Sequence, residues 1–131
     1  MDAPAPKIER LKKRPEFLAA AKGASISRGA VVVQALRHEG RGSIRAGFTA
    51  TRRIGGAVVR NCAKRRLREA ARMLLPQFGR PGCDYVFIAR NGTPTRPWAR
   101  LLDDVKSALI SLAAPPPAGD APPRDAARPP R

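Results

Sequence analysis

The chain has 131 residues, enough for one small domain with a tail, and it carries 26 Lys and Arg against 10 Asp and Glu, a formal net charge of +16. A folded domain with this imbalance repels itself unless a polyanion neutralises it, so the expected partner is nucleic acid or an anionic membrane surface rather than a small neutral substrate. No apolar run approaches the ~18 residues of a membrane-spanning helix, and the basic start of the chain lacks the apolar stretch of a secretory signal.

The first half of the chain predicts one helix and two strands. Residues 15–22 have Pro in the first turn and are followed by Gly23, which are the start and stop signals of a short helix. Residues 30–36 are apolar and rich in valine, which favours a strand. Residues 44–51 alternate in polarity with period two and predict the next strand, and the charges and glycines between the two strands indicate a hairpin loop.

The second half predicts a long helix, a strand and a final helix. Residues 57–75 contain no Gly or Pro and are rich in Ala, Arg and Leu, a helical composition. Residues 84–90 are largely apolar and end at an Asn-Gly turn pair, so they predict a strand. The last helix begins near Pro97, and its apolar residues recur at a spacing that lets one side pack on the sheet. These residues are Trp98, Leu101, Leu102, Val105, Leu109 and Leu112.

The C-terminal segment has a different composition. Residues 115–131 contain 7 of the 14 prolines and no large apolar residue that could anchor a core. Such a segment cannot offset the entropy cost of ordering itself. We therefore predict one mixed domain over residues 7–113 and a disordered tail, rich in Pro, Ala and Arg, over residues 114–131.

The predicted helix over residues 57–75 separates its side chains by charge. At about 100° per residue, cations and one asparagine collect on one face, whereas small and apolar side chains that could dock on a sheet fall on another arc. The cationic face holds Arg60, Asn61, Lys64, Arg65, Arg68 and Arg72, and the apolar arc holds Val59, Ala63, Leu67, Ala70 and Leu74. Like charges four residues apart destabilise a helix by about a few tenths of a kcal/mol per pair, and solvated faces usually mix both signs. The excess of cations therefore predicts a phosphate-binding face.

The segment before this helix extends the same chemistry. Arg52 and Arg53 precede a glycine pair that lets the backbone approach a ligand closely, and a helix N-terminus offers free N–H donors to an anion. Arginine suits bidentate phosphate contacts and stacking on exposed bases. Asn61 can both donate and accept, so it could hold a neighbouring arginine or contact a ribose or a hydrated metal ion, unless it is an ordinary surface asparagine.

One continuous motif runs from Gly47 through the basic helix. It consists of Gly47-Phe48-Thr49 followed by Arg52-Arg53-Ile54-Gly55-x-Ala57-Val58-x-Arg60-Asn61-x-x-Lys64-Arg65-x-x-Arg68-Glu69. This order closely resembles the signature of the bacterial ribonuclease P protein component. The Arg-Asn-x-x-Lys-Arg-x-x-Arg core is far more specific than a generic basic helix, and the flanking residues 10–13 and 84–90 agree. The resemblance covers nearly all of residues 8–112.

The resemblance implies both a fold and an activity. The fold is α+β, a small two-layer α/β sandwich of order αβββαβα with a left-handed βαβ crossover, like the second domain of ribosomal protein S5. The activity is that of a cytoplasmic ribonucleoprotein, an endoribonuclease that removes the 5′ leader of precursor tRNA and leaves a 5′-phosphate. The resemblance places the active site in the RNA subunit, which also binds most of the required Mg²⁺. The implied partners are this catalytic RNA and the precursor tRNA, with no membrane.

The resemblance also assigns roles to residues. The residues expected against the catalytic RNA, or extending that surface, are Arg52, Arg53, Arg60, Asn61, Lys64, Arg65, Arg68 and Arg72. A cleft between the first helix and the sheet would hold the single-stranded leader, with Phe17 on its wall beside Lys12 and Lys13. Cations beside an aromatic ring are the usual grip on single-stranded RNA, although a lone Phe in a small domain also serves as core. The positions where the family often carries further aromatic residues hold Ala20 or Ala21, and Ala30. The leader platform is therefore expected to be weaker or built differently.

The polypeptide itself is not expected to be catalytic or to bind a metal. Cys62 and Cys83 are too few for a disulfide framework or a zinc site, and they are expected to be reduced thiols that pack. His38 is the only histidine and is expected to be exposed in a charged hairpin loop. The acids between positions 40 and 113 do not converge as a two-metal site requires, and Glu69 is interpreted as a partner for Arg65 or Arg72. These acids are Glu69, Asp84, Asp103 and Asp104.

Other classes of function remain open at this point. A structural RNA-binding protein of ribosomal type would carry the same basic helix with no role in tRNA processing. A helix-turn-helix DNA-binding module is disfavoured, because a strand follows the basic helix and no partner helix precedes it. A self-sufficient ribonuclease would cleave RNA without an RNA subunit.

Overall fold

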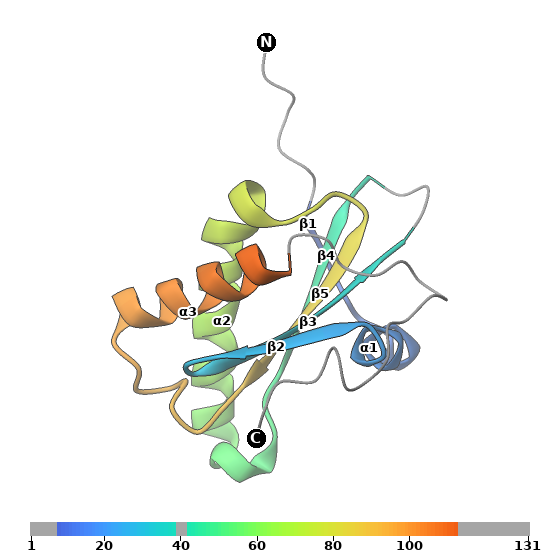
Figure 1. Ribbon diagram of the computed structural model, residues 1–131. Helices are drawn as coiled ribbons and strands as arrows, with labels where there is room; N and C mark the ends of the chain where they lie inside the picture. The colour runs from blue at the N-terminus through green and yellow to red at the C-terminus, as the bar shows by residue number, and fades with distance from the viewer. Residues whose placement is uncertain (1–7, 39–41, 113–131) are drawn as a thin grey trace.

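The computed structural model describes residues 8–38 and 42–112 (Figure 1). The predicted tail over residues 114–131, residue 7 at the predicted domain start and the tip of the hairpin loop lie outside the described residues. The elements in chain order are β1 (Ile8–Arg10), α1 (Arg14–Ala21), β2 (Ala24–Arg28), β3 (Val31–Arg37), β4 (Ile44–Thr49), the 3-10 helix η1 (Arg52–Ile54), α2 (Ala57–Phe78), β5 (Cys83–Ala89) and α3 (Trp98–Ser111).

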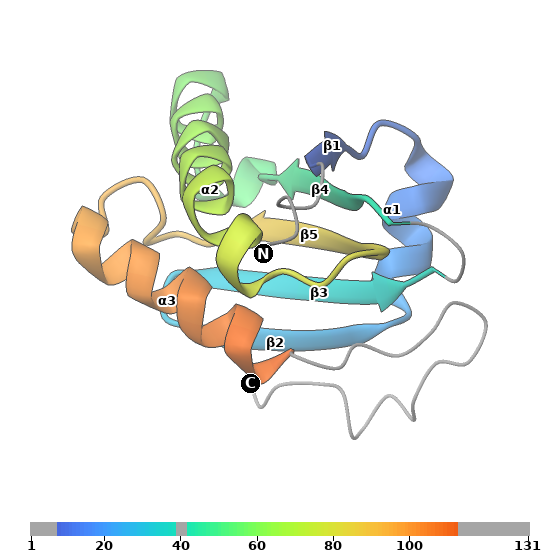
Figure 2. The same ribbon diagram turned by 90° about the horizontal axis from the view of Figure 1, so that it is seen from above.

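The strands form one five-stranded sheet in the order β1-β4-β5-β3-β2 (Figure 2). Strand β3 pairs antiparallel with β2 and β5, whereas β4 pairs parallel with β5 and β1. The parallel neighbours β4 and β5 are joined through η1 and α2, so the basic helix lies in a βαβ crossover, as the sequence led us to expect.

The two faces of the sheet carry different helices. Helices α2 and α3 cover one face, and the short helix α1 covers part of the other. Strand β5 shows why, because its side chains alternate: Tyr85 and Phe87 enter the large core under α2 and α3, while Val86 enters a small cluster with Leu11 and Ala20 under α1. The sheet therefore has a heavily packed side and a lightly packed side.

Two strands were not anticipated from the sequence pattern alone. Strand β2, over Ala24–Arg28, completes the αβββαβα order that the resemblance implies, and β1 adds a three-residue strand at the opposite edge. All five residues of β2 are half-buried, so no clear alternation marks it. Its position is set by pairing with β3, from Ala24 opposite Ala35 to Arg28 opposite Val31.

Helix α2 ends later than predicted. It continues to Phe78 although Pro76 lies inside its last turn. A proline near the end of a helix removes a single backbone donor, and the buried Leu75 still anchors this turn, since its carbonyl accepts the N–H of Gly79 at 2.8 Å. The ring of Phe78 then packs against the core.

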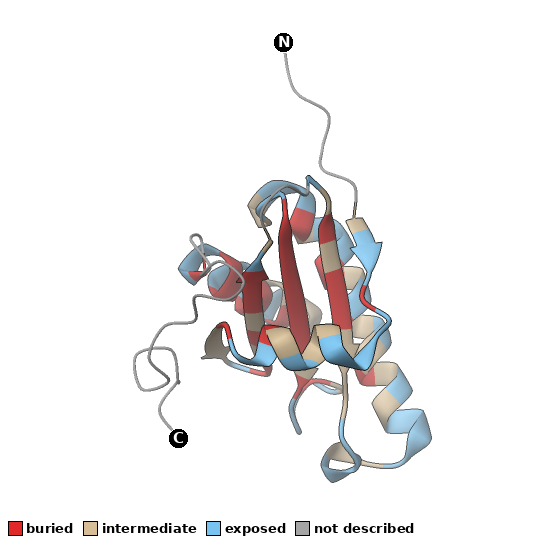
Figure 3. Ribbon diagram, turned by 90° about the vertical axis from the view of Figure 1, so that its right-hand side faces the viewer, coloured by how far each residue is buried: buried red, intermediate tan, exposed pale blue. Residues whose placement is uncertain are grey.

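The first turns of α2 extend beyond the sheet. Ala63, Leu67 and Ala70 are fully buried as the apolar arc predicted, but Val59 from the same arc is 36% exposed. Figure 3 shows the start of this helix as an exposed end below the sheet. The end of α2 that carries the arginine motif is therefore accessible to a large partner.

Candidate RNA interface

Helix η1 presents the first two cations of the motif. Arg52 and Arg53 are both exposed on this short helix, which ends at Gly55. Gly55 has φ +143°, and a Cβ there would lie 2.8 Å from the Cβ of Val59, so a side chain would be strained and would collide with α2. This glycine lets the turn pack on the first turn of α2 and brings both arginines next to the basic helix.

The predicted cationic side of α2 is present. Asn61, Arg65, Arg68 and Arg72 are exposed and Arg60 and Lys64 are half-buried. Together with Arg52 and Arg53 these six residues form what we call the basic surface. Among the described residues, Arg72 is the only member that forms an ion pair. Its partner is Glu69, for which the sequence suggested Arg65 or Arg72. The hydrogen bond and charge of Arg72 lower the pKa of Glu69. The other cations of the basic surface are left for an external anion.

Arg66 lies among these cations in sequence, but its side chain makes contacts within the protein. Its guanidinium donates to the backbone oxygen of Thr93 at 2.6 Å and to that of Arg96 at 2.5 Å, and it lies 5.7 Å from the centre of the Trp98 ring. These contacts tie α2 to the segment that leads into α3. Arg66 is therefore not counted in the basic surface.

An open groove lies at the sheet edge where β1 stops. The N–H of Leu11 makes the last bond to β4, donating to the oxygen of Ala46 at 2.9 Å, and the chain then leaves the edge for α1. The groove has a volume of about 420 Å³ and is lined by Arg10, Leu11, Lys12, Phe17 and Phe48. It combines two aromatic rings with two cations, the chemistry that holds single-stranded nucleic acid.

Phe17 is a core residue that also lines the groove. Its ring packs against the small cluster of Leu11, Ala20 and Val86, and it also lines the groove. A Cβ at Gly47 would lie 2.5 Å from this ring, so the glycine makes room for it. Phe17 is thus a core residue with one part of its surface on the groove.

The groove differs in detail from the sequence expectation. Lys12 lines it, whereas Lys13 is the exposed N-cap residue of α1 and does not. Phe48 and Arg10 line the groove but were not predicted to. Phe48 stacks on Phe87 with ring centres 5.4 Å apart, and its place in the Gly-Phe-Thr motif was the one signal for it.

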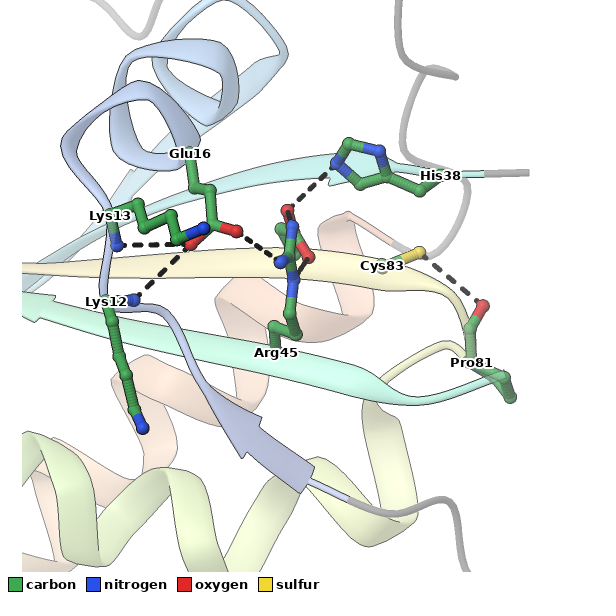
Figure 4. A network of polar contacts seen from close by, with 8 residues as sticks. Lys12, Lys13, Glu16, His38, Arg45, Pro81 and Cys83 are labelled. Atoms are coloured by element: carbon green, nitrogen blue, oxygen red, sulfur yellow. Dashed lines mark hydrogen bonds and ion pairs between the residues drawn. The ribbon is translucent and has the colours of Figure 1, made fainter. Parts of the chain in front are cut away.

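A cluster of charged side chains lies beside the groove, at the start of α1 (Figure 4). It consists of Glu16, His38, Arg45 and Asp84, and we call it the Arg45 cluster. Burial acts to raise the pKa of Glu16, but the backbone N–H of Lys13 and the charge of Arg45 outweigh it and lower that pKa. The hydrogen bond to Asp84 raises the pKa of Arg45. The expectation of an exposed His38 is wrong, since this residue is half-buried and its Nε2 lies 2.9 Å from Oδ2 of Asp84.

The remaining polar candidates have structural partners. Asp104 accepts the N–H of Ala30 at 3.0 Å and pairs with Arg96, and Asp103 is exposed. Within residues 8–38 and 42–112, no three His, Cys, Asp or Glu side chains gather as metal ligands would. Cys62 is half-buried and Cys83 is buried, and neither forms a disulfide within the described residues. None of the helices in the described ranges is long and apolar enough to cross a membrane.

Comparison with known proteins gives a consistent result. The family model described as Ribonuclease P matches residues 5–113. The ribonuclease P protein component of Caulobacter vibrioides (strain NA1000 / CB15N) is 67% identical over 109 residues, covering 82% of this chain and 73% of that protein. The ribonuclease P protein component of Ruegeria pomeroyi is 50% identical over 113 residues, covering 84% of this chain and 90% of that protein.

The fold matches solved structures as well. The RNase P protein from Thermotoga maritima superposes with a TM-score of 0.69 at 28% identity, covering 79% of this chain and 96% of that one. The RNase P protein of Staphylococcus aureus gives a TM-score of 0.66 at 25% identity, covering 76% and 91%. A basic surface on α2, a sheet of matching topology and a family match over most of the length thus agree, and the chain belongs to the ribonuclease P protein family.

Proposed function

We propose that this chain is the RNA-binding protein subunit of ribonuclease P. In this role the basic surface binds the catalytic RNA, and the groove binds the 5′ leader of precursor tRNA. The particle then removes the leader by endonucleolytic hydrolysis and leaves the mature 5′ end of the tRNA with its phosphate.

The observation that carries the proposal is the basic surface in a chain of this family. Its cations are held on one rigid helix and the turn before it, and all except Arg72 lack an ion-pair partner in the described part of the chain. Aligned cations on an exposed helix repel one another, so binding an RNA backbone would relieve their repulsion. The six arginines of the basic surface suit bidentate contacts to phosphate oxygens, which a lysine cannot make.

Leader binding is supported by the groove. The rings of Phe17 and Phe48 offer apolar surface to unpaired bases, and Arg10 and Lys12 offer charge to the phosphates. Stacking of a base on an aromatic side chain is worth about 1–3 kcal/mol. Phe48 gives the groove a second ring besides that of Phe17.

The chemistry is proposed to reside in the RNA. Asp84 and Asp104 are paired with Arg45 and Arg96, and no three His, Cys, Asp or Glu side chains gather in the described part of the chain. Mg²⁺ is therefore proposed as a cofactor held mainly by the RNA subunit. Cys62 and Cys83 form no disulfide within the described residues, which is consistent with a reducing compartment, and we place the particle in the cytoplasm.

Cleavage of a precursor tRNA at low Mg²⁺ tests the proposal in three mixtures: protein alone, ribonuclease P RNA alone, and both. We expect efficient cleavage only in the mixture of both. If the protein adds nothing to the RNA, a structural RNA-binding protein of ribosomal type becomes the better description. If the protein cleaves after stringent removal of RNA, the assignment of the active site to the RNA is wrong.

A further inference from the structure

A chain of charged groups connects α1 to the sheet beside the groove. Arg45, on β4, donates from Nε and Nη2 to the two carboxylate oxygens of Asp84 on β5, at 2.8 and 2.7 Å. Its third nitrogen, Nη1, donates to Glu16 on α1 at 2.5 Å. The side chain of Asp84 is 1% exposed and that of Arg45 is 18% exposed. One guanidinium is thus held by two carboxylates from two different layers of the protein.

Glu16 also accepts hydrogen bonds from the backbone at the start of α1. Its second carboxylate oxygen accepts the N–H of Lys13 at 3.2 Å and that of Lys12 at 3.4 Å. Lys12 lines the groove, and the residue after Glu16 is Phe17, which lines it too. The Phe17 ring rests on Gly47, two residues from Arg45 on the same face of β4. Two groove residues are therefore attached to Glu16: Lys12 through its backbone N–H, and Phe17 as the next residue in the chain.

Apolar packing alone anchors α1 weakly. Of its eight residues only Ala20 is buried, and Leu18 is 51% exposed. The hydrogen bond from Arg45 to Glu16 adds a directional anchor, because a planar guanidinium held by Asp84 leaves one position for the carboxylate of Glu16. His38 packs against the same Asp84 and closes the cluster on the side of β3.

We propose that Arg45, acting through Glu16, is a positioning residue for leader binding. It touches no RNA itself; it holds the first turn of α1 so that Phe17 and Lys12 face a single-stranded 5′ leader. The inference rests on the proposed leader-binding function and adds a residue pair to it that lies outside both the groove and the basic surface.

The test compares two substrates on the reconstituted holoenzyme: a precursor tRNA with a long single-stranded leader and one with a leader of a single nucleotide. The affinity for the long-leader substrate divided by that for the single-nucleotide substrate, which we call the leader ratio, reports on the groove. Contacts of the tRNA body and of the catalytic RNA are common to both substrates and cancel. We expect Arg45→Met to lower this ratio about tenfold, the worth of roughly one stacked base, and to leave affinity for the single-nucleotide substrate and for the catalytic RNA unchanged. Arg45→Lys keeps the charge but not the fork, and we expect an intermediate ratio.

Arg96→Met is the matched control. Arg96 also binds an aspartate with two nitrogens, at 2.9 and 3.2 Å from Asp104, but it lies beside α3 and does not line the groove. Its loss is expected to lower stability without changing the leader ratio. If Arg45→Met does not fold, Glu16→Gln provides the test, since it keeps the size and an acceptor oxygen while removing the charge that Arg45 binds.

The results separate leader binding from the role of Arg45. A wild-type holoenzyme with no preference for the long leader would overturn leader binding and the role of Arg45 with it. A wild-type preference that Arg45→Met or Glu16→Gln retains in full would overturn only the role of Arg45. Equal losses on both substrates, matched by Arg96→Met, would show that the Arg45 cluster acts on stability alone.

Discussion

At position 47 the chain has no room for a side chain. A Cβ on Gly47 would lie 2.5 and 2.7 Å from two carbons of the Phe17 ring and 3.1 Å from the Cβ of Leu11. The clash involves a ring held in the cluster under α1, so it cannot be relieved by rotating a flexible side chain. The lack of a side chain at Gly47 therefore allows the Phe17 ring to take its place in the groove wall.

We expect Gly47→Ala to destabilise the fold by about 1–3 kcal/mol, the usual cost of overpacking, and to weaken binding of a long leader. Chemical denaturation measures the first effect. Gly42→Ala is the control, because Gly42 is exposed and a Cβ there meets nothing within 4 Å, so it reports the change in unfolded-chain entropy by itself. Equal unfolding free energies for the two variants would contradict this account of Gly47.

At the scale of the element, α2 divides its arginines between two tasks. Arg65 and Arg68 are exposed, whereas Arg66 is half-buried and bonded to the oxygens of Thr93 and Arg96. Arg65 and Arg66 are neighbours in sequence, yet at about 100° per residue they project in different directions. The docking of α2 beside α3 decides which direction meets protein and which meets solvent.

This division predicts opposite phenotypes for neighbouring residues. Replacing Arg65 and Arg68 together by Ala should weaken binding of the catalytic RNA at least about tenfold and leave the melting temperature unchanged, because neither side chain has a protein partner among the described residues. Arg66→Ala should instead lower stability by about 1–3 kcal/mol, through two lost hydrogen bonds and one cation–π contact. Binding titrations and thermal melts on the same preparations measure both. A melting temperature lowered by the double replacement would show that these arginines also support the fold.

For the whole molecule, with its net charge of +16, the number of phosphates that its cations neutralise determines how binding responds to salt. Each phosphate neutralised on single-stranded RNA contributes about −0.7 to the slope of log affinity against log salt concentration, because condensed counterions are released. With five or more phosphates bound by the basic surface and the groove, we expect a slope of about −3.5 or steeper for the isolated protein. Filter-binding or fluorescence titrations over a range of salt concentrations measure it. A flat response would contradict binding through the basic surface.

Much of the candidate site could be predicted from the sequence because it depends on local periodicity. The cationic side of α2 follows from helical geometry and residue order, and so does the burial of Ala63, Leu67 and Ala70. The strong strands β3, β4 and β5 follow from apolar or alternating runs. The specific motif around Arg60 and Asn61 indicated the family by sequence alone. These properties belong to contiguous stretches, and contiguous stretches are visible in a sequence.

The tertiary structure decided what depends on distant partners. Strand β2 has a weak sequence signal and forms because its backbone pairs with β3. Strand β1 likewise forms by pairing with β4. Phe48 joins Phe17 in one groove because β1 stops at Arg10 and leaves the sheet edge open.

Charged residues show the same limit most clearly. Arg45 and Arg66 count as cations of the motif region in sequence, but 39 residues separate Arg45 from Asp84 and 27 separate Arg66 from Thr93. Since a side chain's charge is local but its partner is not, the sequence by itself determined which face of α2 is basic and which family the chain resembles. Only the tertiary structure decided which arginines remain available for RNA.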